Sequence, residues 1–317
     1  MKQSILVKPQ QSRLEDRPIP EPGQEDVVVR VKACGVCASE LNGWKGDGGT
    51  YPKEYGHEVA GDVVAVGSGV KGITLGMRVT GLFSKGFAEY TRAPQQFVTP
   101  IPDGMAYEHA LGEPLGCILS GARRTNVELG DTVALVGLGF MGLLMLQAVR
   151  LRGPARIIAI DTRSDALESA RQFGADETYT PDSIPDRLMM TEWGRVGKGF
   201  GADVVFENSG TSSGLTLASR IVREHGILSI VGWHQGGTRQ VDMEMWNWKG
   251  FNVINAHERR PDYLMDCMRR GLSLVASGRM DTGSLISHRF SLDNVDGAFR
   301  VLVEKPAGFH KAIVLTG

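Results

Sequence analysis

The chain has 317 residues, of which 42% are hydrophobic and 22% are charged, and its net charge at pH 7 is −1. This length allows two domains of ordinary size, and the composition is that of a globular protein. Because positive and negative charges nearly cancel, no overall field attracts nucleic acid or an anionic membrane, and we expect neither as a partner.

Cysteine usage and the N-terminal residues bear on the cellular compartment. Four cysteines are too few for a disulfide scaffold in a chain of this size. Residues 1–8 contain no uninterrupted apolar stretch, so we expect no signal peptide. The most apolar window, 133–149, holds three glycines and a glutamine, which fits a strand, a turn and a helix better than a membrane span. We therefore expect a cytoplasmic protein.

The first hundred residues are typical of short strands separated by glycine and proline. Strands are predicted over 27–33, 59–66 and 86–91, which indicates a mostly antiparallel β-domain. Cys34 and Cys37 form a C-x-x-C pair, but no thioredoxin-like βαβ pattern follows. We expect Cys34 to be a buried core residue at the end of a strand.

From about Leu129 strands alternate with helices, which predicts a parallel sheet. Strands are expected over 155–160, 202–207 and 226–232, and helices over 163–173 and 261–277. We expect the sheet edge near 226–231 to pair with a second copy of the chain, giving a homodimer or homotetramer.

The segment Thr132–Leu143 leads from an apolar strand into three glycines in the order G-x-G-x-x-G. In dinucleotide-binding units one such glycine makes the tight turn, one lets the backbone approach the pyrophosphate, and one permits close helix–strand packing. A chain with 41 glycines can hold this pattern by chance. Here the helix, the second strand and a terminal acid all follow, so we predict a dinucleotide site with phosphates at the helix N-terminus.

Asp161 is that terminal acid, placed to accept hydrogen bonds from the ribose hydroxyls. A 2′-phosphate would meet a like charge there, so we expect NAD rather than NADP. Two interpretations of Arg163 stay open. It either weakens the preference for NAD over NADP, or it is a solvated residue at the start of a helix. The predicted cofactor residues are Gly137, Gly139, Phe140, Met141, Gly142, Asp161 and Arg163.

Potential metal ligands lie outside the dinucleotide motif. Cys37, the pair His57 and Glu58, and Glu113 supply a thiolate, an imidazole and carboxylates. Zinc accepts all three donor types, and a catalytic zinc takes three protein ligands and keeps one open position. Their spacings fit no zinc-finger pattern.

With these motifs the chain resembles the zinc-dependent medium-chain dehydrogenases/reductases of the alcohol and polyol type. The resemblance rests on Cys-Gly-Val-Cys-x-Ser-Glu at 34–40, Gly-His-Glu-x-x-Gly at 56–61 and Glu-Pro-Leu at 113–115. It covers essentially the whole chain and is strongest to the sorbitol dehydrogenases. It implies a GroES-like, β-rich catalytic domain from 1–115 and 257–317. A doubly wound, Rossmann-type α/β domain over 116–256 is inserted, and the active site is expected in the cleft between them.

The resemblance also implies the roles of individual residues. Cys37, His57 and Glu113 would bind one catalytic zinc, and Glu58 would be a neighbour that exchanges onto the metal. Ser39 would take the proton of the alcohol. Each role has a plainer alternative. Ser39 would instead cap backbone N–H groups at a helix start, and Glu58 would lie behind the ligands or at the surface. The four-cysteine lobe that binds a second zinc in larger relatives is missing.

The predicted reaction is the reversible oxidation of a secondary alcohol of a polyol, cyclitol or sugar to the ketone, with zinc and NAD. Two alternatives are a zinc-free enone or quinone reductase of the same superfamily and a non-catalytic nucleotide-binding protein. Four further residues have open roles. His234 and His257 either line the nicotinamide pocket or are ordinary loop histidines, and Trp44 and Tyr51 either wall the substrate pocket or pack on the β-domain.

Overall fold

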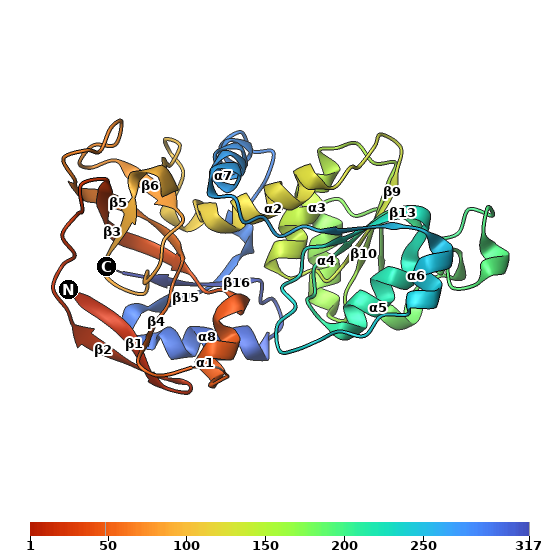
Figure 1. Ribbon diagram of the computed structural model, residues 1–317, viewed down its shortest axis with the longest axis horizontal. Helices are drawn as coiled ribbons and strands as arrows, with labels where there is room; N and C mark the ends of the chain where they lie inside the picture. The colour runs from red at the N-terminus through yellow and green to blue at the C-terminus, as the bar shows by residue number, and fades with distance from the viewer. Residues whose placement is uncertain (48, 317) are drawn as a thin grey trace. The chain divides into compact units, whose positions relative to one another are not determined.

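The computed structural model describes residues 1–47 and 49–316, and its chain divides into two compact units (Figure 1). Unit 1 is formed by Met1–Cys117 together with the segment from Arg259 to the C-terminal end, and unit 2 by Ile118–Glu258. The boundaries expected from the sequence, after residues 115 and 256, each lie two residues before the boundaries of the structure, which follow Cys117 and Glu258.

Unit 1 is built around a seven-stranded sheet with the order β15-β16-β3-β5-β6-β8, to which β7 adds by pairing with β3. All its pairings are antiparallel except that of β15 with β16. The strands are β3 (Asp26–Gly35), β5 (Glu58–Val66), β6 (Arg78–Gly81), β7 (Tyr90–Pro94), β8 (Val98–Pro100), β15 (Ile286–Ser291) and β16 (Lys311–Leu315). The strand expected from residue 86 thus begins only at Tyr90.

A second, three-stranded sheet and four helices complete unit 1. The sheet has the order β2-β1-β4, with β1 (Lys2–Lys8), β2 (Gln11–Asp16) and β4 (Lys53–Glu54). The helices are α1 (Leu41–Lys45), α2 (Gly112–Arg124), α7 (Pro261–Ala276) and α8 (Val295–Glu304). Helix α2 contains the boundary between the units.

The core of unit 1 explains the role of Trp44. Its ring is 2% exposed and stacks on Phe299 at a centroid distance of 5.3 Å, while Nε1 donates a hydrogen bond to Asp296 at 2.8 Å. Phe87 meets the same phenyl ring edge-on. Of the two alternatives for Trp44, the structure therefore supports packing in the β-domain. Cys34 is fully buried in the same core, as expected.

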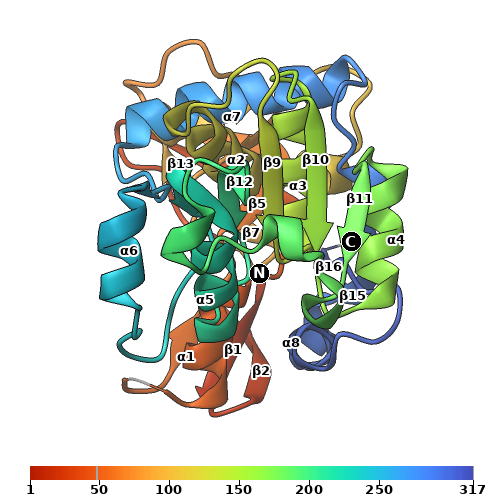
Figure 2. The ribbon, with the colours of Figure 1, turned by 90° about the vertical axis from the view of Figure 1, so that its right-hand side faces the viewer.

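Unit 2 is a six-stranded, wholly parallel sheet with the order β11-β10-β9-β12-β13-β14 (Figure 2). The strands are β9 (Thr132–Val136), β10 (Arg156–Ile160), β11 (Glu177–Tyr179), β12 (Ala202–Glu207), β13 (Val222–Ile230) and β14 (Asn252–Asn255). Numbered from the first strand, this is the 3-2-1-4-5-6 order of a doubly wound dinucleotide-binding fold. The predicted fold class is confirmed.

The central strands of unit 2 are apolar because both faces of the sheet are covered. Four residues in a row are buried in β9 and again in β10. The helices are α3 (Phe140–Arg150), α4 (Ser164–Gln172), α5 (Ser212–Ile221) and α6 (Met243–Lys249). Among the described residues, no helix has the length and hydrophobicity needed to span a bilayer.

The prediction of a free sheet edge at 226–231 is wrong. These residues lie in or directly after β13, which is hydrogen-bonded to β12 on one side and to β14 on the other. The edge is formed instead by β14, whose residues Asn252, Val253 and Asn255 are exposed. The four-residue strand Asn-Val-Ile-Asn is too short and too polar to stand out in the sequence.

Replacing Trp44 by alanine should lower the free energy of unfolding by about 3–5 kcal/mol, since a large, fully buried ring is lost from a packed core. The matched control is Trp193→Ala, because Trp193 is 68% exposed. Its effect should stay below about 1 kcal/mol. Thermal or urea unfolding of both variants measures the difference, and equal losses would contradict the assignment of Trp44 to the core.

Candidate functional site

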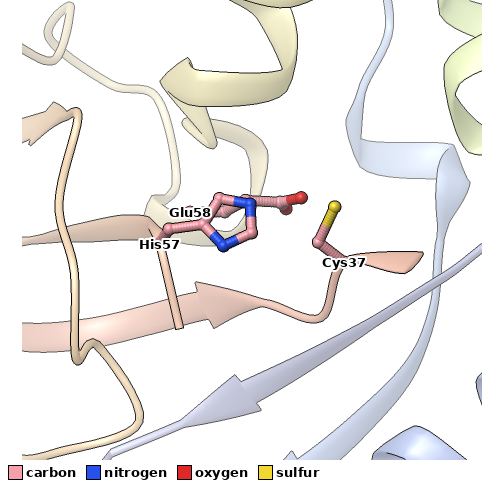
Figure 3. Close-up of side chains that lie close together, drawn as sticks. All are labelled: Cys37, His57 and Glu58. Atoms are coloured by element: carbon pink, nitrogen blue, oxygen red, sulfur yellow. The ribbon is translucent and has the colours of Figure 1, made fainter. Parts of the chain in front are cut away.

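Three potential metal ligands meet in unit 1 (Figure 3). One donor atom each from Cys37, His57 and Glu58 lies within 4.8 Å of the other two. Strand pairing brings them together: β3 ends at Gly35 and β5 begins at Glu58, and these two residues face each other in the antiparallel register. The residues just after β3 and just before β5 therefore share one end of the sheet.

Glu58 is held in this group by two residues that the sequence analysis did not identify. A side chain at Gly35 would collide with Oε2 of Glu58, so the missing side chain makes room for the carboxylate. Lys311, the first residue of β16, donates a hydrogen bond to Oε1 at 2.8 Å, and its Nζ lies 2.6 Å from Oε2. Both side chains are almost fully buried. Burial lowers the pKa of Lys311, but the charge of Glu58, that of Cys37 and the hydrogen bond to Glu58 together outweigh burial, and the pKa is raised.

His57 is oriented by a buried carboxylate on its far side. Its Nδ1 lies 3.0 Å from Oε1 of Glu40, which also accepts the N–H of Gly56 at 2.8 Å. Burial lowers the pKa of His57, but hydrogen bonds to Cys37 and Glu40 outweigh it and raise the pKa to about 12. A cation is thus strongly favoured in this position. A carboxylate that orients a histidine from behind is also the usual partner of a metal-binding imidazole.

Glu113 lies near this group without being part of it. It occupies the first turn of α2, and its Oε1 accepts a hydrogen bond from Cys117 Sγ at 3.3 Å. Burial raises its pKa, and the positive charge of His57 lowers it in part. The set of donors within 4.8 Å of one another contains Glu58 as its carboxylate and does not include Glu113. The ligand set Cys37, His57 and Glu113 expected from the sequence stays a prediction.

Ser39 lies in a 3-10 turn, Ala38–Glu40, directly after Cys37. Its hydroxyl is exposed and donates a hydrogen bond to Cys37 Sγ at 3.2 Å. The N-cap position of this turn is Cys37, and no side chain caps it. The hydroxyl of Ser39 is therefore directed at the metal-binding group.

The three glycines of the dinucleotide motif in unit 2 have distinct environments. Gly137 has a φ of 91°, which favours glycine, and a Cβ there would lie 2.7 Å from the backbone nitrogen of Ser209. A Cβ at Gly139 would meet open space, where a pyrophosphate has room to approach the backbone. A Cβ at Gly142 would collide with the carbonyl oxygen of Gly137, so this glycine permits the close packing of α3.

The start of α3 offers backbone groups rather than side chains. Phe140 is its first residue and is 7% exposed, so its ring is not free to line a site. Backbone N–H groups in the first turn of a helix, the turn that here contains Phe140 and Met141, point along the helix axis and are suited to binding phosphate.

Asp161 connects the first strand–helix loop to the second. Its Oδ2 accepts the N–H of Leu138 at 2.6 Å, and Oδ1 accepts the N–H of Arg163 at 2.9 Å. The guanidinium of Arg163 lies 3.4 Å from Asp165. Arg163 is thus paired with Asp165 rather than being a fully solvated residue.

The residues of this site fit a zinc ion by their chemistry. A thiolate, an imidazole and a carboxylate form a mixed donor set of the kind zinc binds in catalytic sites. The negative charges around His57 that raise its pKa would also stabilise a bound metal cation.

The chain is similar to known proteins over most of its length. Residues 23–103 match the family described as alcohol dehydrogenase GroES-like domain, and residues 141–276 match zinc-binding dehydrogenase. The sorbitol dehydrogenase of Bacillus subtilis is 27% identical over 333 residues, covering 94% of this chain and 92% of that protein. An alcohol dehydrogenase of Cupriavidus necator is 28% identical, covering 99% and 98%.

A solved structure from Sinorhizobium meliloti, assigned as a zinc-binding dehydrogenase and bound to NADP, is 28% identical to this chain. Its TM-score is 0.85, over 99% of this chain and 98% of that one. The chain belongs to the zinc-dependent medium-chain dehydrogenase family, and it is an oxidoreductase of the alcohol and polyol dehydrogenase class. The resemblance inferred from the sequence is confirmed.

Proposed function

We propose that this protein binds one catalytic zinc ion through Cys37, His57 and Glu58 and oxidises a secondary alcohol of a polyol, cyclitol or sugar to the ketone with NAD. The observation that carries this proposal is the convergence of the three donor atoms within 4.8 Å. Three protein ligands leave a fourth position for substrate, as in other catalytic zinc sites. A zinc-free reductase would have no use for such a set.

When bound, the zinc ion supplies Lewis acidity toward the substrate hydroxyl and the nicotinamide supplies a hydride acceptor. The residues of the chain then have three tasks. Cys37 and His57 provide donors, and Glu40 orients the imidazole by its hydrogen bond to Nδ1. Ser39 accepts the hydroxyl proton at Oγ and, being exposed, passes it to water.

Glu58 and Glu113 compete for the role of the third ligand. Glu58 is favoured because Gly35 and Lys311 hold its carboxylate beside Cys37 and His57. Lys311 also draws electron density from that carboxylate, which makes it a weaker ligand and one that can leave the metal. Glu113, whose Oε1 accepts a hydrogen bond from Cys117, is the second carboxylate that could replace it or bind a water molecule in the fourth position.

NAD is the proposed cofactor because of the charge at Asp161. Its carboxylate is fixed by two backbone N–H groups at the end of β10, where the adenosine ribose binds in this fold. The Sinorhizobium meliloti relative holds NADP. In this chain Arg163 is engaged with Asp165, which leaves the negative charge of Asp161 to oppose a 2′-phosphate.

The proposed substrate class follows from the relatives. Two similar curated proteins carry the names sorbitol dehydrogenase and alcohol dehydrogenase, at 27–28% identity over more than nine tenths of this chain. A site that combines zinc with NAD is suited to oxidising the secondary hydroxyl groups of polyols and related alcohols.

The proposed assembly is a homo-oligomer that pairs two copies of β14. This strand leaves one row of backbone N–H and C=O groups unpaired and carries neither proline nor charge. The opposite edge, β11, is protected by Glu177, which forms an ion pair with Arg187. Antiparallel pairing of β14 with itself gives a closed twofold interface.

The proposed reaction is tested with a panel of polyols, cyclitols and sugars, followed by the absorbance of the reduced cofactor with NAD and NADP in parallel. We expect turnover of at least one polyol-class substrate with NAD. Cys37→Ser should lose bound zinc and at least about 10³-fold in kcat/KM, since a thiolate ligand is lost, while NADH still binds. Cys267→Ala, a change at a buried cysteine in α7, is the control. Undiminished activity in Cys37→Ser would overturn the mechanism.

The third ligand is identified by comparing two isosteric variants. Glu58→Gln should lower zinc content or affinity about 10-fold to 100-fold, because it removes both the ligand and the partner of Lys311. Glu113→Gln should retain zinc with about wild-type affinity. Metal analysis after dialysis against a graded chelator gives both affinities. The reverse order would assign the ligand role to Glu113.

The interface is tested with Val253→Lys, which places a charge on the exposed edge strand. We expect a shift from dimer or tetramer toward smaller species in sedimentation velocity. Val64→Lys, at a residue of similar exposure in β5, a strand paired on both sides, should leave the assembly unchanged. An unaltered assembly in Val253→Lys would rule out pairing through β14.

A further inference from the structure

A buried carboxylate in unit 2 has no part in the site described so far. Glu207 is the last residue of β12 and is fully buried. Its Oε1 accepts the N–H of Ser209 at 2.8 Å, the N–H of Gly210 at 3.0 Å and the hydroxyl of Ser209. Its Oε2 lies 2.8 Å from Nε2 of His234.

The hydrogen bonds of His234 define which nitrogen carries the proton. Arg239 Nε donates to Nδ1 of His234 at 3.2 Å, so Nδ1 is an acceptor and Nε2–H donates to Glu207. The guanidinium of Arg239 also donates to the carbonyl oxygens of Gln235 and Gly237. The loop after β13 is therefore closed on itself and fastened to Glu207.

All partners of the Glu207 carboxylate are donors. A carboxylate is acceptor-only and satisfies four donors at once, whereas the amide of glutamine would direct an N–H group at another donor. The position thus requires a carboxylate and not merely a polar side chain of the same size.

Glu207 fastens two loops next to the first glycine of the dinucleotide motif. Ser209 packs so closely on Gly137 that a Cβ there would lie 2.7 Å from its backbone nitrogen. A Cβ at Gly210 would lie 2.7 Å from the carbonyl oxygen of Trp233, so the loops after β12 and β13 also touch without intervening side chains. Three loops at the carboxyl edge of the sheet are therefore held together around one carboxylate.

These loops belong to the second half of the doubly wound sheet. In this strand order the first half, β9 and β10, binds the adenosine part of a dinucleotide, here at Asp161. The loops after β12 and β13 then face the second nucleotide, which carries the nicotinamide. Trp233, in the loop after β13, is 48% exposed and meets the ring of His257 at 5.2 Å.

We propose that Glu207 is a positioning residue for the nicotinamide half of the cofactor, acting through Ser209 and His234. This inference rests on the proposed dinucleotide function. It implies that the adenosine half and the nicotinamide half bind to separately supported parts of unit 2, so that loss of the Glu207 contacts weakens one and spares the other.

The test measures the dissociation constants of NADH and of ADP, which lacks the second nucleotide, by calorimetry. In Glu207→Gln the constant for NADH should rise about tenfold, as expected for loss of a hydrogen bond to a charged group, and that for ADP should change less than about twofold. His234→Ala, a change confined to the loop after β13, should show the same split and serves as the second variant if Glu207→Gln does not fold.

Asp203→Asn is the matched control for a purely structural effect. Asp203 lies in the same strand near its opposite end, where it pairs with Arg223 and accepts the N–H of Thr132. The Asp203→Asn variant should have a lower melting temperature, and its dissociation constants for NADH and ADP should be unchanged. Equal weakening of NADH and ADP in the Glu207 and His234 variants, or no weakening of either ligand, would overturn the proposal. If the wild-type protein binds neither ligand, the proposed function fails and this inference fails with it.

Discussion

The site in unit 1 depends on one electrostatic constraint: several anionic groups are brought together where little water reaches them. The pairing of β3 with β5 places Cys37, His57 and Glu58 at one end of the sheet. The only protein cations in direct contact with Glu58 and Glu40 among the described residues are Lys311 and the protonated His57. Such a cluster is stable only with a cation at its centre, and a divalent metal satisfies that need with the imidazole neutral.

In unit 2, single carboxylates hold the loops at the carboxyl edge of the parallel sheet in place. Asp161 joins the glycine loop to the loop after β10, and Glu207 joins the loops after β12 and β13. Each accepts hydrogen bonds from backbone N–H groups that would otherwise lack partners, which fixes the loops without large side chains. Glycines at the points of closest approach let the loops touch, and Gly139 leaves room for a ligand to reach the backbone.

Sequence reasoning predicted the fold class, the family and the residues of the local motifs, because these depend on short-range patterns: glycine spacing, strand periodicity and motif order. It did not identify Lys311, which lies 253 residues from Glu58, since nothing local marks a lysine whose partner arrives through strand pairing. It also gave Glu113 as the third ligand, which stays a prediction, because the packing around Gly35 that holds Glu58 beside Cys37 and His57 is not marked in the sequence. The free edge was misplaced for a similar reason, since the short strand β14 covers β13.

The central claim is that one zinc ion is bound by a thiolate, an imidazole and a carboxylate. X-ray absorption at the zinc edge on the purified protein tests it most directly. The account predicts one sulfur at about 2.3 Å and nitrogen or oxygen neighbours at about 2.0–2.2 Å, with one zinc per chain. A shell of several sulfurs, a shell without sulfur, or a protein that retains no zinc while oxidising its substrate would contradict it.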